Sequence, residues 1–174
     1  MAIFIITFGA FIVGILLIVS LKKISPPNPQ EQIHFDNPDD VPRYLQDQQA
    51  FKDKCVEFLE KFNLEYVHSV WANEHELEIA MNDETPVVGG VYLALCIIDP
   101  PNKTVDALKV KGFLDSVKGE GASRGIMITT GYFDDKAINL IDEEPVELVN
   151  VVDFISYLKK FEIYEVSFFD PIIG

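Results

Sequence analysis

The chain has 174 residues, with 28 acidic and 14 basic side chains and a formal net charge of −14. This length accommodates one domain of ordinary size plus an appendage, and the acidic balance disfavours the broad basic surface that nucleic-acid binding requires. Cys55 and Cys96 are its two cysteines. Both occupy apolar positions that we expect to be buried, which is typical of a reducing compartment.

The N-terminal segment is predicted to be a transmembrane anchor. An uncharged run begins at Ala2 and ends at Leu21. As a helix it rises about 1.5 Å per residue, enough to span a hydrocarbon core of roughly 30 Å. A cleaved signal peptide is the alternative, but it would need a basic segment before the run, where a single residue stands. Lys22 and Lys23 follow the run, so the positive-inside rule predicts a single-pass membrane protein whose folded domain is cytoplasmic.

Four segments follow from composition: an anchor (1–23), a proline-rich linker (24–43), a folded domain (44–164) and an apolar tail (165–174). The prolines of the linker disfavour a helix and favour an extended spacer that holds the domain off the membrane surface. The tail, EVSFFDPIIG, either packs back on the domain or meets a partner, and both interpretations stay open.

The folded domain is predicted to begin with an amphipathic helix over residues 44–62 that ends at Asn63. Its apolar positions fall near one face: Leu45, Phe51, Cys55, Phe58, Leu59 and Phe62. Two strands follow, over residues 65–71 and 75–81, and a turn-rich loop then leads to an apolar strand over residues 90–98. The nearly continuous apolar run of that third strand is typical of a central strand covered on both faces.

A second helix, a glycine turn and a buried strand are predicted from Val105 onward. Apolar residues recur there at helical spacing: Val105, Leu108, Phe113, Leu114 and Val117. Gly119 and Gly121 are expected to end the helix, and GIMITT from Gly125 is the buried strand. Asp134 is the expected N-cap of the next helix, over residues 134–143. A strand over residues 146–149 and a helix over residues 151–161 complete the α/β domain.

The segment VKGFLDSVKGEGASRGIMITTGYFDDKA resembles the Mrr-like branch of the restriction-endonuclease-like nucleases, the PD-(D/E)xK superfamily. The matching residues are Gly112, Gly125, Ile126, Ile128, Thr129, Thr130, Gly131, Phe133 and Ala137. The resemblance implies an α/β, restriction-endonuclease-like core, with a helix, three strands, a helix and a strand, then helix-strand-helix, behind the N-terminal transmembrane helix. It covers roughly residues 51–160, and the predicted elements occur in that order.

The resemblance also implies where an active site would lie. The family places an acid at the end of the second strand, and a Glu or Gln followed two residues later by a Lys on the third. Alternate residues of a strand share a face, and the acids hold Mg²⁺ through oxygen ligands. Here those positions are Glu78, Leu95 and Ile97. Leucine and isoleucine neither bind a cation nor carry charge, so the motif is degenerate, and we expect no catalytic residue, metal or cofactor.

A migrated site is the alternative. Lys109 or Lys111, on the helix after the third strand, would replace the missing lysine, with Asp83 or Glu84 as a second carboxylate beside Glu78. The chain would then be a Mg²⁺-dependent DNA endonuclease of the Mrr type, acting in restriction or DNA turnover at the membrane. We favour the degenerate motif, with Glu78 as a solvated acid and the two apolar positions as core.

Charge and the remaining motifs favour a protein partner over DNA. From Tyr44 onward there are 24 acidic and 11 basic residues, a net charge of about −13 that repels a polyanion. A local cluster of cations is interpreted as a solvated helix face: Lys103, Lys109, Lys111, Lys118 and Arg124. The histidines lack metal-ligand spacing, no small-molecule site is evident, and Thr129-Thr130-Gly131 is read as structural rather than as an anion site.

The sequence therefore predicts a membrane-anchored nuclease-fold domain, inactive as an enzyme, that acts as a binding or scaffolding module.

Overall fold

The computed structural model describes residues 41–86, 89–100 and 103–164. The predicted anchor, most of the linker and the apolar tail lie outside the described residues. Within the described ranges, no helix is long and apolar enough to cross a membrane.

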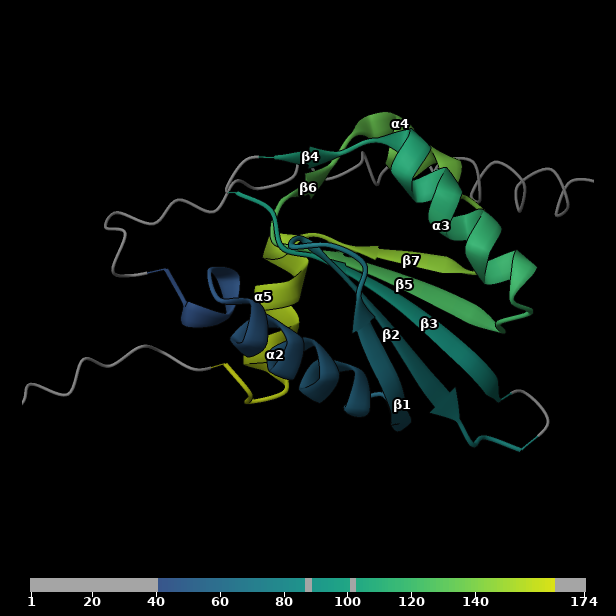
Figure 1. Ribbon diagram of the computed structural model, residues 1–174, viewed down its shortest axis with the longest axis horizontal. Coiled ribbons are helices and arrows are strands. Elements are labelled where there is room, and N and C mark those ends of the chain that lie inside the picture. The colour runs from purple at the N-terminus through teal and green to yellow at the C-terminus, as the bar shows by residue number, and fades with distance from the viewer. Residues whose placement is uncertain (1–40, 87–88, 101–102, 165–174) are drawn as a thin grey trace, which may run out of the picture. The chain divides into compact units, whose positions relative to one another are not determined.

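Four α-helices and one 3-10 turn form the helical part of the described domain (Figure 1). Each α-helix begins after a residue whose side chain accepts a hydrogen bond from a backbone N–H of the first turn, which satisfies donors that the helix itself leaves unpaired. The elements are η2 (Arg43–Leu45), α2 (Gln48–Glu60), α3 (Ala107–Gly119), α4 (Asp135–Leu140) and α5 (Val151–Lys160). The capping residues are Asp47, Asp106, Asp134 and Asn150.

A five-stranded mixed sheet separates the helices, with the order β1-β2-β3-β5-β7. The first three strands are antiparallel and the last three are parallel, so β3 is central, as predicted. The strands are β1 (Leu64–Trp71), β2 (Glu76–Asp83), β3 (Gly90–Ile97), β5 (Arg124–Thr129) and β7 (Val146–Val149). A second, two-stranded parallel sheet pairs β4 (Thr104–Val105) with β6 (Tyr132–Phe133) and was not predicted.

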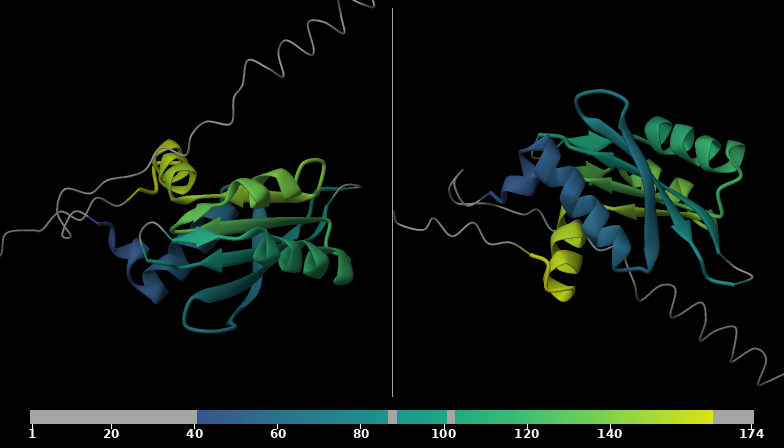
Figure 2. Two further views of the ribbon diagram at one scale, coloured as in Figure 1. Left: turned by 90° about the horizontal axis from the view of Figure 1, so that it is seen from above. Right: turned by 60° about the horizontal axis from the view of Figure 1, so that its bottom comes forward.

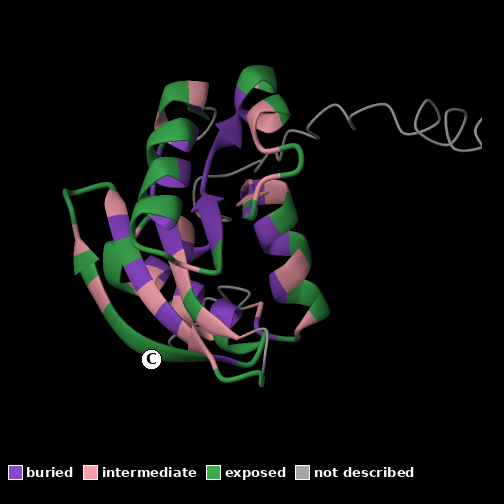
Figure 3. Cartoon of the chain, turned by 90° about the vertical axis from the view of Figure 1, so that its right-hand side faces the viewer, coloured by how far each residue is buried: buried purple, intermediate pink, exposed green. Residues whose placement is uncertain are grey.

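The helices cover both faces of the large sheet (Figures 1 and 2). The α2 and α5 helices pack on one face, where Phe51, Phe58 and Phe154 are fully buried and meet edge to face. The α3 and α4 helices lie on the other face, and their inward residues form a second apolar cluster with β3 and β5. Figure 3 shows the same division, with buried residues on the sides of the helices that face the sheet.

The α/β architecture and the predicted order of the main elements are confirmed, but several boundaries and burial predictions were wrong. The first helix is interrupted, because Asp47 caps a new helix after the η2 turn. Val105 belongs to β4, so α3 starts two residues later than its apolar spacing indicated. In consequence Leu108 points outward and is 78% exposed. Phe62, which follows α2, is 45% exposed.

The turn residues and the cysteines behave as the sequence indicated. Asn63 and Gly121 adopt positive φ angles of 60° and 67° where α2 and α3 end, a conformation that favours Asn and Gly. Cys55 and Cys96 are buried free thiols. Burial and the neighbouring Cys96 raise the pKa of the Cys55 thiol, so it stays protonated and behaves as a small core residue.

Candidate functional site

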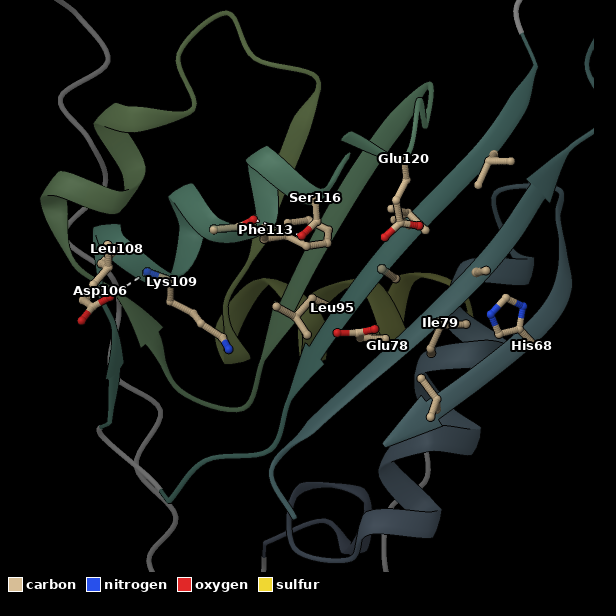
Figure 4. A pocket seen from close by; sticks show the side chains of 16 residues that line it. His68, Glu78, Ile79, Leu95, Asp106, Leu108, Lys109, Phe113, Ser116 and Glu120 are labelled. Carbon is tan, nitrogen blue, oxygen red and sulfur yellow. Dashed lines mark hydrogen bonds between the residues drawn. The ribbon is translucent and has the colours of Figure 1, made fainter. Parts of the chain in front are cut away.

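The positions that the family uses for catalysis come together on the α3 face of the sheet. In the antiparallel pair of β2 and β3, Glu78 lies opposite Leu95 and Glu76 lies opposite Ile97. Because cross-strand partners and alternate residues share a face, these four side chains form one patch beneath α3. Figure 4 shows Glu78 and Leu95 side by side in this patch.

Two of the four positions are apolar core. Leu95 is 6% exposed and Ile97 is 4% exposed, and both belong to the cluster that α3 completes with Val110 and Phe113. The predicted core role of these two residues is therefore confirmed. Their packing explains why apolar side chains are retained there, since a charge at either place would be buried.

Glu78 is an exposed carboxylate on this patch. It has no hydrogen-bond or ion-pair partner among the residues that the structure describes. The predicted second carboxylates do not join it, because Asp83 lies five residues further along β2, which is about 17 Å of extended chain, and Glu84 follows Asp83. The Asp83 carboxylate instead interacts with Thr85. The Thr85 side chain, together with the Thr85 N–H that donates to the carboxylate at 2.9 Å, lowers the pKa of Asp83.

Lys109 is the lysine that reaches back to the sheet. Its Nζ lies 2.6 Å from the Glu76 carboxylate in a partly exposed ion pair. Figure 4 shows the side chain running from α3 down toward Glu78 and Leu95. Lys111 is exposed, and two residues further along a helix it projects from another side of α3. Of the two migrated lysines considered, the structure thus brings Lys109 alone to the patch.

A second ion pair lies next to the first, in a hollow of about 530 Å³. The Lys103 Nζ lies 2.7 Å from the carboxylate of Asp99, whose side chain is 4% exposed. The hydrogen bond and charge of Asp99, with a smaller contribution from Glu76, raise the pKa of Lys103. Of the four acids that line this hollow, Glu76 and Asp99 are therefore engaged by lysines.

The Thr129-Thr130-Gly131 turn organises this edge of the sheet. The Thr130 hydroxyl accepts a hydrogen bond from the Asp99 N–H and donates one to the Asp99 carbonyl, at 2.7 and 2.8 Å. The Thr129 hydroxyl accepts from the Gly131 N–H at 3.0 Å. A Cβ at Gly131 would lie 2.3 Å from the Lys103 carbonyl oxygen, so only glycine fits. These bonds occupy the turn's hydroxyls, in agreement with its predicted structural role.

The donor set does not fit a Mg²⁺ ion. That ion needs several oxygen ligands in a near-octahedral arrangement, whereas the patch offers Glu78 and a Glu76 carboxylate already paired with Lys109. Within residues 41–86, 89–100 and 103–164, no group of three or more His, Cys, Asp and Glu side chains is placed to hold a metal ion.

A groove of about 580 Å³ opens between α3 and strands β1 to β3, directly over the patch. Its lining is largely apolar: Val70, Val91, Leu93, Leu95, Leu108 and Phe113. Glu78, Asp106 and Glu120 border it (Figure 4). Sequence reasoning missed the groove, although the alternation of Val91, Leu93 and Leu95 on one face of β3 was a readable signal.

The predicted cation cluster does not form an open basic surface. Lys103, Lys109 and Lys118 pair with Asp99, Glu76 and Glu144, the last pair at 2.8 Å. Arg124 is exposed, with the Asp83 carboxylate close enough to feel its charge. Most of these charges are therefore offset locally, which favours the interpretation as a solvated helix face.

The family comparison agrees with this geometry. Residues 95–158 match the family model Mrr_cat, described as "Restriction endonuclease". Together with the order of the strands and helices, this match confirms a restriction-endonuclease-like fold. The matched model is that of the Mrr-like branch, which the sequence around residues 125–131 had indicated.

Solved structures with a similar arrangement include two restriction enzymes. One is titled "MspJI Restriction Endonuclease in Complex with 27-mer Oligonucleotide", with 16% identity and a TM-score of 0.44 over 63% of this chain and 26% of that one. The other, "DNA modification-dependent restriction endonuclease AspBHI", has 12% identity and a TM-score of 0.45 over 77% of this chain and 40% of that one. The chain thus covers less than half of either enzyme. No curated protein matches it.

Proposed function

We propose that the chain is a membrane-anchored nuclease-fold domain that has lost its catalytic motif and acts as a binding or scaffolding module for a protein partner. One observation carries this proposal: the position that should hold the metal, opposite Glu78, is occupied by the buried side chain of Leu95. A leucine there supplies no oxygen ligand and excludes water from the place where one would bind.

The surroundings of Leu95 support the same proposal. The lysine position, Ile97, is buried, and the ammonium group of Lys109 is tied to Glu76 rather than free to meet a phosphate. The groove above these residues is mostly apolar with an acidic border. Such a surface suits apolar side chains of another protein better than it suits a polyanion.

The membrane attachment rests on the sequence. Residues 2–21 carry no charge and are long enough to span a bilayer, and Lys22 and Lys23 favour a cytoplasmic domain. The prolines of residues 24–43 would then act as a spacer that lets the groove meet partners beyond the headgroups.

A second candidate function is a Mg²⁺-dependent DNA endonuclease of the Mrr type with a rearranged site. The observation that favours it is the position of Lys109, which arrives from α3 at the carboxylate beside Glu78. This arrangement has the acid and the lysine of a nuclease site, but it lacks a second free carboxylate. DNA would also have to approach an acidic domain.

The full-length chain in detergent, incubated with supercoiled plasmid and Mg²⁺ or Mn²⁺, tests the proposal. Glu78→Ala and Lys109→Ala serve as variants, and Lys111→Ala is the matched control on the same helix. We expect no nicked or linear product from any of the four proteins. Metal-dependent cleavage that disappears in Glu78→Ala and Lys109→Ala, but persists in Lys111→Ala, would contradict the loss of activity and establish the rearranged site.

A further inference from the structure

The floor of the groove is a part of the sheet that no helix of the described domain covers. The α3 helix packs over β3 and β5 and, in the described domain, leaves the α3-side faces of β1 and β2 open (Figure 2). Val70 on β1 and Val91 on β3 are consequently 54% and 47% exposed. Antiparallel strands commonly leave one face in water, but here that face carries exposed valines beside the apolar groove lining, so it presents an apolar surface suited to a further helix.

The side of α3 that borders this strip allows a second helix to pack closely against it. Gly112 and Ser116, one helical turn apart, both line the groove. A Cβ built at Gly112 would meet nothing within 4 Å, which places open space directly against the helix backbone. Small residues at this spacing allow a second helix to pack closely against the first. Leu108, at the start of the wall, offers an exposed apolar contact.

The charged residues around the groove indicate that its occupant is positively charged. Glu78 on the floor and Glu120 at the end of α3 have no ion-pair partner in the described part of the chain. The Asp106 carboxylate is engaged at the N-cap of α3, and the charge of Lys109 is offset by Glu76. Glu78 and Glu120 therefore place two unpaired negative charges beside the apolar floor.

We propose that the groove binds a basic amphipathic helix of a partner protein, an inference that rests on the proposed binding function. Aliphatic side chains at positions i, i+3 or i+4, and i+7 of that helix would contact Val70, Val91 and Leu93, in the helix-in-groove mode of recognition. Lys or Arg residues at the edges of its apolar stripe would pair with Glu78 and Glu120. An extended strand fits less well, because a sheet face offers no free backbone hydrogen-bonding groups.

A peptide library identifies what the groove selects. The probe is a phage library of 18-residue peptides with leucine at helical spacing and every other position randomised, panned against the full-length chain in detergent. We expect enriched peptides to be cationic. We also expect Glu78→Lys combined with Glu120→Lys to weaken their binding at least about tenfold and to reverse the charge preference in a fresh selection.

A pair of glycine variants tests the location. Gly112→Trp places an indole in the groove and should abolish binding, whereas Gly119→Trp adds the same group to the same helix outside the groove lining and should leave binding unchanged. Both proteins are compared by their thermal unfolding midpoints. If Gly112→Trp fails to fold, the exposed charge variants still decide the question.

Other outcomes separate the two proposals. A library that yields no binder, binders with no preference for positive charge, or binders unaffected by the groove variants would overturn this inference. Binding at another surface, without plasmid cleavage, would leave the proposed binding module intact. Plasmid cleavage dependent on Glu78 would overturn the module itself, whatever the library yields.

Discussion

The two faces of the central sheet are built from the same alternating strands but end in different states. On the α2 and α5 face, alternate residues of β2 and β3 are sealed beneath aromatic side chains centred on Phe154. On the α3 face, the interleaved residues pass from a buried patch at Leu95 and Ile97 to exposed valines at the far side of the groove. Within the described domain, helices cover the first face, whereas part of the second face remains exposed.

On the proposed function, this difference shows where the chain departs from an active nuclease. The larger of the two core clusters lies on the sealed face, away from the catalytic positions. The catalytic positions lie on the open face, and their apolar replacements extend the core into the place where a metal would sit. Stability is thus retained by one face while the other is free to take up a different binding role.

The largest expected effect is a difference in the free energy of unfolding between a variant on the sealed face and a variant on the open face. Phe154→Ala should lower the free energy of unfolding by about 3–5 kcal/mol, because Phe154 is fully buried among aromatic rings. Val70→Ala should lower it by less than about 1 kcal/mol, since most of that side chain is already in water. Urea denaturation measures both. Equal losses would show that the open face is covered in the folded protein.

Two glycines sharpen the contrast on the α3 side. Gly125→Ala places a methyl group 2.6 Å from Val117 and 3.0 Å from Phe113, so we expect a loss of about 1–3 kcal/mol. Gly112→Ala should instead stabilise the protein by about 0.5–1 kcal/mol, because alanine favours a helix and the groove leaves room for it. Thermal unfolding of the two variants checks the signs. Destabilisation by Gly112→Ala would mean that the groove is filled.

The ion pair of Lys109 should matter little for stability. Removing it in Lys109→Ala should cost about 0.5 kcal/mol, because both side chains are partly exposed. The value comes from denaturation midpoints in low and high salt, with Lys111→Ala as the control. A cost several times larger, insensitive to salt, would indicate that Glu76 is desolvated and that the open face is more enclosed than the structure indicates.

The smallest expected effect is a pH dependence at the far end of β2. Because the Thr85 hydrogen bond lowers the pKa of Asp83 in the folded state, its carboxylate stabilises the protein above the unfolded pKa of about 4. That contribution is lost as the pH falls through the folded pKa. Asp83→Asn should therefore be slightly less stable than the parent at pH 7 and equally stable near pH 2. Unfolding midpoints across this range provide the test, and a difference that grows toward low pH would contradict it.

Much of the fold followed from the sequence, because the signals that set element boundaries are local. The cap at Asp134, the end of α2 at Asn63 and the boundaries of β7 were each predicted from a few neighbouring residues. The family resemblance supplied the long-range order that such signals lack. The pairing of β4 with β6 escaped prediction, since two residues on each side leave no periodic pattern.

The open half was harder to predict, because its features depend on where separate elements meet. The roles of Leu95 and Ile97 followed from their chemistry and strand spacing, and their burial is confirmed. The sequence did not decide whether Lys109 or Lys111 reaches the site, because that depends on where α3 begins. The apolar spacing predicted a start at Val105, whereas Val105 lies in β4 and the helix begins at Ala107. The groove exists because α3 covers only some of the strands on its side of the sheet. How many strands a helix covers depends on tertiary packing and cannot be inferred from a local sequence pattern.

The central claim, that the nuclease centre no longer holds a metal, is tested most directly by titrating Mn²⁺ into the full-length chain in detergent. Isothermal titration calorimetry beside Glu78→Ala provides the measurement. We predict no saturable binding that distinguishes the two proteins up to millimolar metal. A stoichiometric Mn²⁺ site present in the parent and absent from Glu78→Ala would contradict the account and favour the metal-dependent nuclease function instead.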